Sequence, residues 1–182
     1  MKNRVLFMGT PEFAVSILEC LLESDVDVIG VVSQPDKPIG RKQILSPSPV
    51  KKLALEHKIP VYQPNKIKEL TETIQNLNLN LIVTCAYGQF IPTAILEAPR
   101  YGSVNVHASL LPKYRGGAPI HKALINGETE SGVTLMRMVK AMDAGNMIAS
   151  VSVPITEDDD VGSLHDKLKV AGAVLLKAKL PV

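Results

Sequence analysis

Apolar residues along this chain occur in two patterns, as short continuous runs and as longer segments in which they recur every three or four positions. The short runs predict β-strands, which span 4–8, 26–33, 59–64, 80–86, 103–108, 132–139 and 146–155. The periodic segments predict helices, which begin near Pro11 and span 50–57, 67–77 and 119–128, with a helical turn after Pro92 and a last helix from Val161. Strands alternating with helices indicate the α/β class: a mainly parallel twisted sheet with helices on both faces and an antiparallel element from the last two strands.

Two of these helices carry a recognisable start signal. Gly9 closes the first strand, and Thr10 followed by Pro11 matches an N-cap residue and a proline at the first helical position. The four acidic residues at 157–160 precede the last helix and suit the positive end of a helix dipole. We therefore expect Thr10 to cap the first helix and the acidic run to lie at the start of the last one.

The stretch 34–50, QPDKPIGRKQILSPSPV, is dense in proline and basic residues. Proline lacks the amide donor and restricts the residue before it, so this stretch predicts a long loop without regular structure. Loops of this length inside a compact domain are usually functional or mobile. Between 36 and 52 five basic residues stand against one acidic residue, whereas the whole chain carries a net charge of only +2.

Composition narrows the class of protein without identifying a function. The 182 residues fit one domain, and 46% apolar with 21% charged residues is ordinary for a soluble globular protein. Cys20 and Cys85 form no C-x-x-C pair, which favours a reduced, cytoplasmic setting. Neither a secretory signal nor a run long enough to span a membrane is present, and the histidines lack metal-ligand spacing. We expect a soluble protein without a metal.

Two polar residues interrupt the strand predicted at 103–108. Asn105 and His107 are two positions apart, so their side chains project from one face about 7 Å apart along the strand. The strand then breaks into a loop at its carboxyl end, where open parallel sheets bind their ligands. An imidazole takes up a proton near neutral pH, and a carboxamide donates hydrogen bonds without titrating, which suits the oxyanion of acyl transfer. Asp143, in the predicted turn 140–145, is the best candidate for a carboxylate that favours the charged imidazole.

Each of these features also has a simpler interpretation when it is taken alone. A single histidine in a strand is usually a hydrogen-bonded structural group, and Asp143 in Asp-Ala-Gly is a typical turn residue. A basic loop is most often a solvated surface. The segment MGTPEFA has only one glycine and lacks G-x-G-x-x-G, so a dinucleotide site is not indicated.

Taken together and in order, the motifs favour catalysis. The chain contains FMGTPEFA, VVSQPDKPIGR, SPVKKLA, VTCAYGQFIP, NVHASLLPKYRGGAPIHKALINGE and MDAGN in that order. This series closely resembles the family of 10-formyltetrahydrofolate-dependent formyltransferases, and within it the methionyl-tRNA formyltransferases, from Met1 to about Leu180. The resemblance implies a Rossmann-like formyltransferase fold and a cytoplasmic enzyme of translation initiation, expected to be a monomer.

The resemblance also implies roles for particular residues. The catalytic group is expected to be Asn105, His107 and Asp143. Binding of the donor 10-formyltetrahydrofolate is expected at Tyr87, Gly88 and Gln89 through the backbone around them, and at Ser109, Leu110, Leu111 and Pro112. The basic loop matches the family's insertion into the acceptor end of initiator methionyl-tRNA, so Lys37, Arg41 and Lys42 are expected to contact tRNA.

Two other functions remain open. The acceptor could be another amine, such as a sugar nucleotide or glycinamide ribonucleotide, because those enzymes share the HASLLP type of segment. The chain could also be a folate-binding module without activity, although such a module has no need of Asn105, His107 and Asp143 together. Family members carry a second, smaller β-barrel domain that also contacts tRNA. We expect residues 1–182 to be the catalytic domain alone, with weakened affinity for tRNA.

Overall fold

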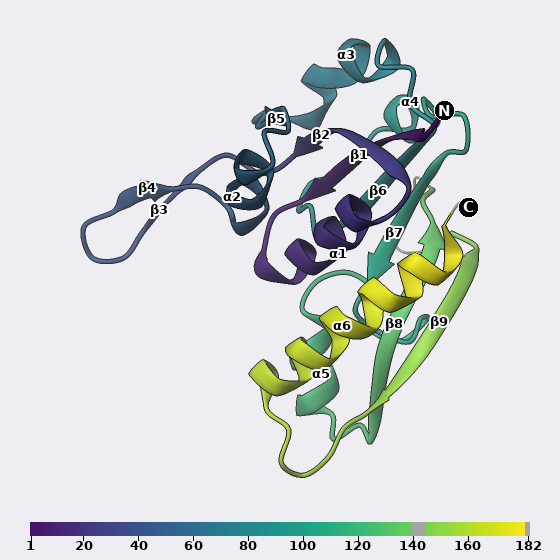
Figure 1. The fold of residues 1–182 in the computed structure, drawn as a ribbon. Helices are drawn as coiled ribbons and strands as arrows, with labels where there is room; N and C mark the ends of the chain where they lie inside the picture. The colour runs from purple at the N-terminus through teal and green to yellow at the C-terminus, as the bar shows by residue number, and fades with distance from the viewer. Residues whose placement is uncertain (140–144, 181–182) are drawn as a thin grey trace.

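The computed structural model describes residues 1–139 and 145–180, and its apolar runs form one seven-stranded sheet (Figure 1). The strands are β1 (Asn3–Gly9), β2 (Val26–Val32), β5 (Val61–Tyr62), β6 (Leu81–Cys85), β7 (Ser103–His107), β8 (Glu130–Arg137) and β9 (Met147–Pro154). Their spatial order is β5-β2-β1-β6-β7-β8-β9. The first five are parallel, and β8 runs antiparallel to both β7 and β9. The predicted α/β class, with its mainly parallel sheet and late antiparallel element, is confirmed.

Helices cover both faces of this sheet, as the alternation of patterns predicted. One face packs against α1 (Glu12–Glu23), α2 (Pro49–Glu56), α5 (Pro119–Ile125) and α6 (Val161–Lys179). The other packs against the 3-10 helix η1 (Ile67–Leu70), α3 (Thr71–Gln75) and α4 (Thr93–Leu96). In the strands β1, β2 and β6, alternate residues point into the two cores, so Phe7 of β1 faces α1 while Leu6 faces the opposite layer. Among the described residues, no helix combines the length and apolar character needed to cross a membrane.

The start of α1 differs from the prediction. The helix begins at Glu12, and the N-cap position is Pro11, which makes no side-chain cap. The Thr10 hydroxyl instead donates to the carbonyl of Tyr87 at 2.9 Å and accepts the Gln34 amide at 3.3 Å. The prediction that Thr10 caps α1 is therefore wrong, because two loops that are remote in sequence compete for its hydroxyl. Thr10 fastens those loops together at the carboxyl end of the sheet.

The basic stretch is a hairpin and not the irregular loop that its prolines predicted. β3 (Lys37–Ile39) pairs antiparallel with β4 (Ile44–Ser46), and the ribbon extends away from the body of the molecule (Figure 1). A two-stranded ribbon leaves one side of each strand unpaired, so Pro38 can be accommodated without its amide donor. Gly40 adopts a φ of 74° at the turn. This local pairing has no signal in the hydrophobic pattern.

The base of the hairpin is held by charge and hydrogen bonds. Asp36, immediately before β3, accepts from the Gln63 amide at 2.7 Å and from Lys51 at 3.1 Å. These two partners, Gln63 first and Lys51 second, hold the pKa of the Asp36 carboxyl below its usual value. The hairpin therefore leaves the domain at a fixed point, beside the carboxyl end of β2.

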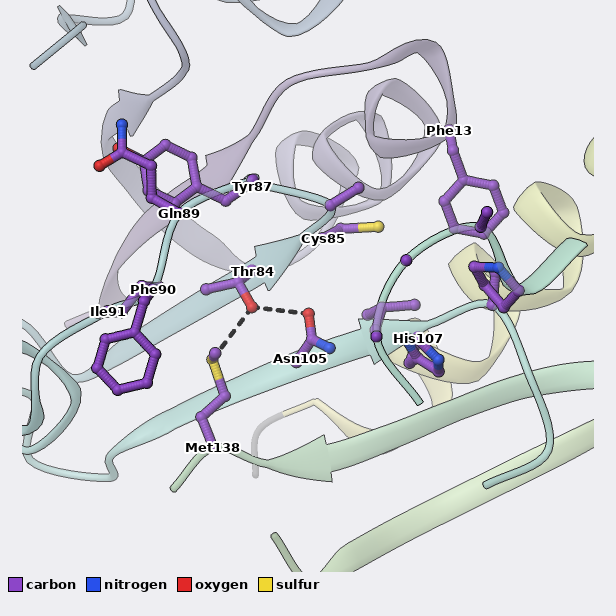
Figure 2. A pocket seen from close by; sticks show the side chains of 18 of the residues that line it. Phe13, Thr84, Cys85, Tyr87, Gln89, Phe90, Ile91, Asn105, His107 and Met138 are labelled. Atoms are coloured by element: carbon purple, nitrogen blue, oxygen red, sulfur yellow. Dashed lines mark hydrogen bonds between the residues drawn. The ribbon is translucent and has the colours of Figure 1, made fainter. Parts of the chain in front are cut away.

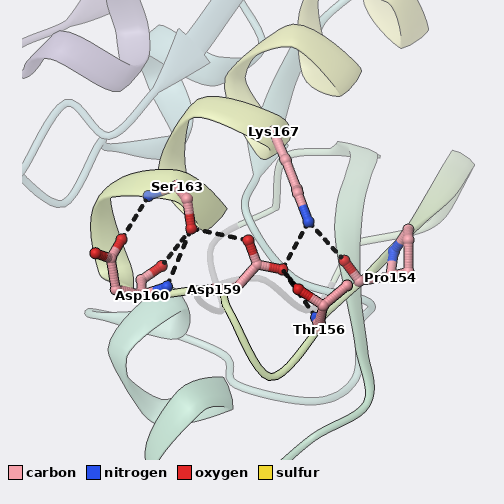
Figure 3. Close-up of polar contacts among 6 residues, drawn as sticks. All are labelled: Pro154, Thr156, Asp159, Asp160, Ser163 and Lys167. Atoms are coloured by element: carbon pink, nitrogen blue, oxygen red, sulfur yellow. Dashed lines mark hydrogen bonds and ion pairs between the residues drawn. The ribbon is translucent and has the colours of Figure 1, made fainter.

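The acidic run does lie at the start of α6, as predicted (Figure 3). Asp160 is the N-cap and accepts the Ser163 amide at 2.8 Å, while the Ser163 hydroxyl accepts the Asp160 amide at 3.0 Å. The Asp159 carboxylate, only 5% exposed, accepts from Lys167 at 2.6 Å, from the Thr156 amide at 2.8 Å and from the Ser163 hydroxyl at 2.8 Å. Asp159 thus ties the loop after β9 to the first two turns of α6.

We expect Asp159→Asn to lower the melting temperature by a few degrees at neutral pH. Lys167, then the Thr156 amide and then Ser163 hold the pKa of the Asp159 carboxyl far below its usual 3.8. A lowered folded-state pKa stabilises the fold above pH 3.8 and loses that contribution as the pH falls below it. Thermal melts at several pH values should therefore show a gap between parent and variant at pH 7 that narrows below about pH 4.

Asp158→Asn is the matched control, because this neighbour is exposed and makes no hydrogen bond within the described ranges. It removes the same charge and should leave the melting temperature nearly unchanged. Equal effects of the two substitutions would show that net charge, and not the contacts of Asp159, stabilises this end of α6.

Candidate active site

A cavity of about 530 Å³ lies at the carboxyl ends of β6 and β7, where both strands give way to loops (Figure 2). It is lined by 84–91, 105–108 and 116–120, with Phe13 from α1 and Met138 after β8. Most of these side chains are apolar, with a few polar groups among them. This size and character are typical of small-molecule sites, which usually enclose about 300–1,000 Å³.

Asn105 and His107 both line this cavity, as their spacing predicted. Val104 and Val106 alternate with them and pack into the core beneath α1 and α6. The Asn105 carboxamide oxygen accepts the Thr84 hydroxyl at 2.8 Å, which leaves the nitrogen of the amide on the side toward His107 (Figure 2). The two side chains are therefore presented together at the end of one strand.

The His107 ring is held by a backbone carbonyl. The side chain is buried, and its Nε2 lies 2.8 Å from the carbonyl oxygen of Tyr114. A carbonyl only accepts hydrogen bonds, so this nitrogen carries a proton. Fixing one ring nitrogen sets both the tautomer and the orientation of the imidazole, which is a requirement for acid–base work at a defined place.

Tyr114 is itself fastened from outside the cavity. Its hydroxyl donates to Glu128 at 2.8 Å and accepts the Asn126 amide at 3.1 Å. Hydrogen bonds from Tyr114 and then from Lys113 hold the pKa of the Glu128 carboxyl below its usual value. Tyr114 also has a φ of 57°, a strained value for a side chain of this size, which is tolerated where surrounding contacts determine the backbone.

The predicted donor-binding residues Tyr87, Gly88 and Gln89 form one wall of the cavity. Gln89 accepts the Ile67 amide at 2.8 Å, and its own amide donates to Gln34 at 2.8 Å. Gly88 has a φ of 98°, and a Cβ there would meet the Gln34 amide at 2.9 Å, so this position requires glycine. The wall is therefore preformed, although its contact with the formyl donor stays a prediction.

The other predicted donor-binding residues, Ser109, Leu110, Leu111 and Pro112, do not line the cavity. Ser109 is buried, and its hydroxyl donates to the Lys113 carbonyl at 2.7 Å. The hydroxyl of Thr134 in β8 donates to the Ser109 carbonyl at 2.7 Å, and the Leu111 amide lies 3.2 Å from that hydroxyl. These contacts brace the loop that returns the Tyr114 carbonyl to His107, and contact of the four residues with the donor remains a prediction.

The remaining predicted residues lie elsewhere. Asp143, predicted to partner the imidazole, lies outside the described residues. Lys37 is on β3, and Arg41 and Lys42 are in the turn that follows; all three are exposed, and none of them lines the cavity. Their predicted contact with tRNA stays a prediction.

Two further ionisable groups of the lining have little capacity to act as nucleophiles at neutral pH. Burial raises the pKa of the Tyr87 phenol to about 12, and burial also raises the pKa of the Cys85 thiol well above its usual range. Both groups therefore stay protonated, and an acyl transfer here would use donors and a proton carrier without a covalent intermediate on these groups. Among the described residues, no three His, Cys, Asp or Glu side chains are grouped so as to share a metal ion.

Thr84, Tyr114, Phe13 and Met138 belong to the site but were missed in the sequence. Thr84 and Met138 reach it through strand pairing, whose register is not readable from one strand. Phe13 fits the apolar face of α1, and its ring also packs edge-on against His165 of α6, with centroids 5.5 Å apart. The signal available in the sequence was the proline and the glycines of the loop after His107. They indicate a constrained loop but do not indicate which of its residues returns to contact β7.

The similarity of this chain to known proteins shows the class to which its fold and site belong. The chain matches the family model described as formyl transferase over residues 1–180, and it belongs to that family. Over 181 residues it is 55% identical to a methionyl-tRNA formyltransferase of Staphylococcus epidermidis and 54% identical to one of Staphylococcus aureus. Each match covers 98% of this chain and 58% of the relative, so the chain spans somewhat more than half of their length. The predicted family is confirmed.

Solved structures agree with the fold. A phosphoribosylglycinamide formyltransferase from Bacillus halodurans superposes with a TM-score of 0.82 at 21% identity, covering 97% of this chain and 92% of that one. A formyltetrahydrofolate deformylase from Pseudomonas syringae gives 0.77 at 23% identity, covering 98% and 61%. At this level of identity the likeness concerns the architecture alone.

Proposed function

We propose that this chain transfers the formyl group of 10-formyltetrahydrofolate to the α-amine of methionine on initiator methionyl-tRNA. The observation that carries the proposal is the pairing of the Asn105 carboxamide and the His107 imidazole at the end of β7, on the wall of a 530 Å³ cavity. An amide donor and a proton carrier side by side are the two groups that acyl transfer between nitrogen atoms requires.

The amine nitrogen attacks the formyl carbon, and the carbonyl electrons move to the oxygen to give a tetrahedral oxyanion. Asn105 and protonated His107 donate to that oxygen as its charge develops. Collapse re-forms the carbonyl and breaks the bond from the formyl carbon to N10 of the folate. The proton lost by the amine reaches N10 through the imidazole or water, and we assign to Asp143 the task of keeping the imidazole charged.

The acceptor follows from the relatives and from the hairpin. The curated relatives of 54–55% identity are named for methionyl-tRNA, whereas the glycinamide enzymes share only the fold at 18–24% identity. Lys37, Arg41 and Lys42 are exposed on the hairpin, which extends away from the body of the molecule and presents positive charge to a polyanionic acceptor (Figure 1). These observations favour tRNA over glycinamide ribonucleotide or a sugar nucleotide, and the catalytic pair disfavours a module that only binds folate.

The test is an assay of formyl transfer from 10-formyltetrahydrofolate to three acceptors: charged initiator tRNA, glycinamide ribonucleotide and an amino-sugar nucleotide. Both this chain and a version extended to the length of its relatives are used. Formyl-methionine formed with tRNA alone supports the proposal. Transfer only to a small acceptor would replace tRNA by that acceptor, and donor binding without transfer by either version would favour the binding module.

We expect Arg41→Ala to weaken binding of initiator tRNA and to leave binding of the formyl donor unchanged. Each lost phosphate contact reduces the slope of log K against log salt by about one. The affinity for tRNA, measured at several salt concentrations from low to physiological, gives that slope. Lys68→Ala, on the exposed surface of η1, is the control of equal charge. A slope that is unchanged in Arg41→Ala, or equally reduced in Lys68→Ala, would contradict the assignment.

A further inference from the structure

Thr84 lies on the strand next to Asn105 and beneath the same cavity. It belongs to β6, is 2% exposed and stands directly opposite Asn105 in the parallel register of β6 and β7. Neighbouring strands in register direct paired side chains to the same face of the sheet. The hydroxyl of Thr84 and the carboxamide of Asn105 therefore meet by construction of the sheet.

The Thr84 hydroxyl has one proton and three acceptors within reach. The Asn105 carboxamide oxygen is 2.8 Å away, the Met138 sulfur 3.1 Å and the Val104 carbonyl 3.5 Å. An amide oxygen accepts more strongly than a thioether sulfur, and the Val104 contact is at the limit of hydrogen-bond length. The proton is thus best used on Asn105, and the oxygen of that carboxamide is fixed toward β6 (Figure 2).

We propose that Thr84 is a positioning residue that holds the Asn105 carboxamide with its NH₂ group toward the reacting formyl oxygen. This inference rests on the proposed function. The two ends of a carboxamide are almost equal in shape, so rotation by half a turn is opposed mainly by its hydrogen bonds. The rotated amide would present its oxygen to a developing negative charge. The NH₂ group of the rotated amide could donate to the Thr84 oxygen, but the Thr84 proton would then have only the Met138 sulfur and the Val104 carbonyl at 3.5 Å as acceptors, both poorer than the amide oxygen.

Two substitutions distinguish the effect of the Thr84 hydroxyl from the effect of its methyl group. Thr84→Val keeps the branched shape that suits a buried strand and removes the hydroxyl, whereas Thr84→Ser keeps the hydroxyl and removes the methyl. We expect kcat of Thr84→Val to fall about three- to tenfold with donor affinity unchanged, because the productive amide orientation is then less populated. Thr84→Ser should stay within about twofold in kcat but lose more thermal stability than Thr84→Val. If kcat falls more in Thr84→Ser than in Thr84→Val, in parallel with thermal stability, then Thr84 contributes only packing and the proposal is wrong.

A double substitution tests whether Thr84 acts through Asn105. Single-turnover formyl transfer is compared in Asn105→Ala with and without Thr84→Val. If Thr84 only orients the carboxamide, the second substitution has no further effect once the carboxamide is gone. An equal loss in both backgrounds would overturn the proposal, because Thr84 would then act on the reaction by another route.

The orientation is also measurable without activity. The Asn105 side-chain amide signals in an amide ¹H–¹⁵N spectrum are assigned by their loss in Asn105→Ala. They should keep their positions in Thr84→Ser and move or divide in Thr84→Val. Unchanged signals in Thr84→Val would overturn the positioning role whatever the enzyme acts on. Displaced signals in a protein that forms no formyl-methionine would retain that role and reject the proposed function instead.

Discussion

Replacing His107 with alanine is expected to slow formyl transfer by about 100- to 10,000-fold, the usual contribution of a positioned acid–base group. Donor affinity should change little, because the apolar wall at 87–91 is untouched by the substitution. Single-turnover transfer and equilibrium titration with the formyl donor measure the two quantities separately. This separation between rate and affinity is what distinguishes a residue at the reacting atoms from one that shapes the pocket.

The substitution also leaves the Tyr114 carbonyl without its donor, so a structural effect must be excluded. His107→Gln provides the comparison, because its amide can still donate to that carbonyl but cannot take up or release a proton near neutral pH. Both variants should be slow, and His107→Gln should melt closer to the parent. His57→Ala, at the exposed end of α2, is the matched control and should transfer at the parental rate. Rates within a few fold of the parent in both His107 variants would remove the imidazole from the mechanism.

Replacing Asn105 with alanine should lower kcat by about 100- to 1,000-fold, the cost of removing one preorganised donor from an oxyanion. The KM of this variant for the formyl donor should remain within a few fold of the parental value, because the amide acts mainly on the charge that appears in the transition state. Steady-state kinetics over a range of donor concentrations separate the two constants. Asn65→Ala, an exposed asparagine outside the cavity, is the control. A raised KM with an unchanged kcat would make Asn105 a binding residue and leave the oxyanion to other donors.

Much of the fold could be predicted because buried strands appear in the sequence as short runs of apolar residues. The runs that form β1 and β6 are mainly apolar, since helices cover both faces of the sheet there. Asn105 and His107 stand out against such a run, and strand alternation places both on one face. The pair that we propose to be catalytic was therefore accessible from the sequence of a single strand.

The supports of that pair were not accessible, because each depends on contacts between remote segments. Thr84 is opposite Asn105 only by the register of β6 with β7, and the Tyr114 carbonyl returns to His107 only through a loop braced on β8. Thr10 was assigned to α1 by a local rule but bonds to Tyr87, 77 positions away. Local propensity identifies a residue that is able to bond, and tertiary packing decides which partner it takes.

The most direct measurement is a crystal structure of the protein with a stable 10-formyl analogue of the folate donor. We predict that the formyl oxygen lies within hydrogen-bond distance of the Asn105 amide nitrogen and beside the His107 ring, with the pterin against the wall at 87–91. A formyl group bound away from the end of β7, or a pterin seated elsewhere on the molecule, would contradict the assignment of this cavity to formyl transfer.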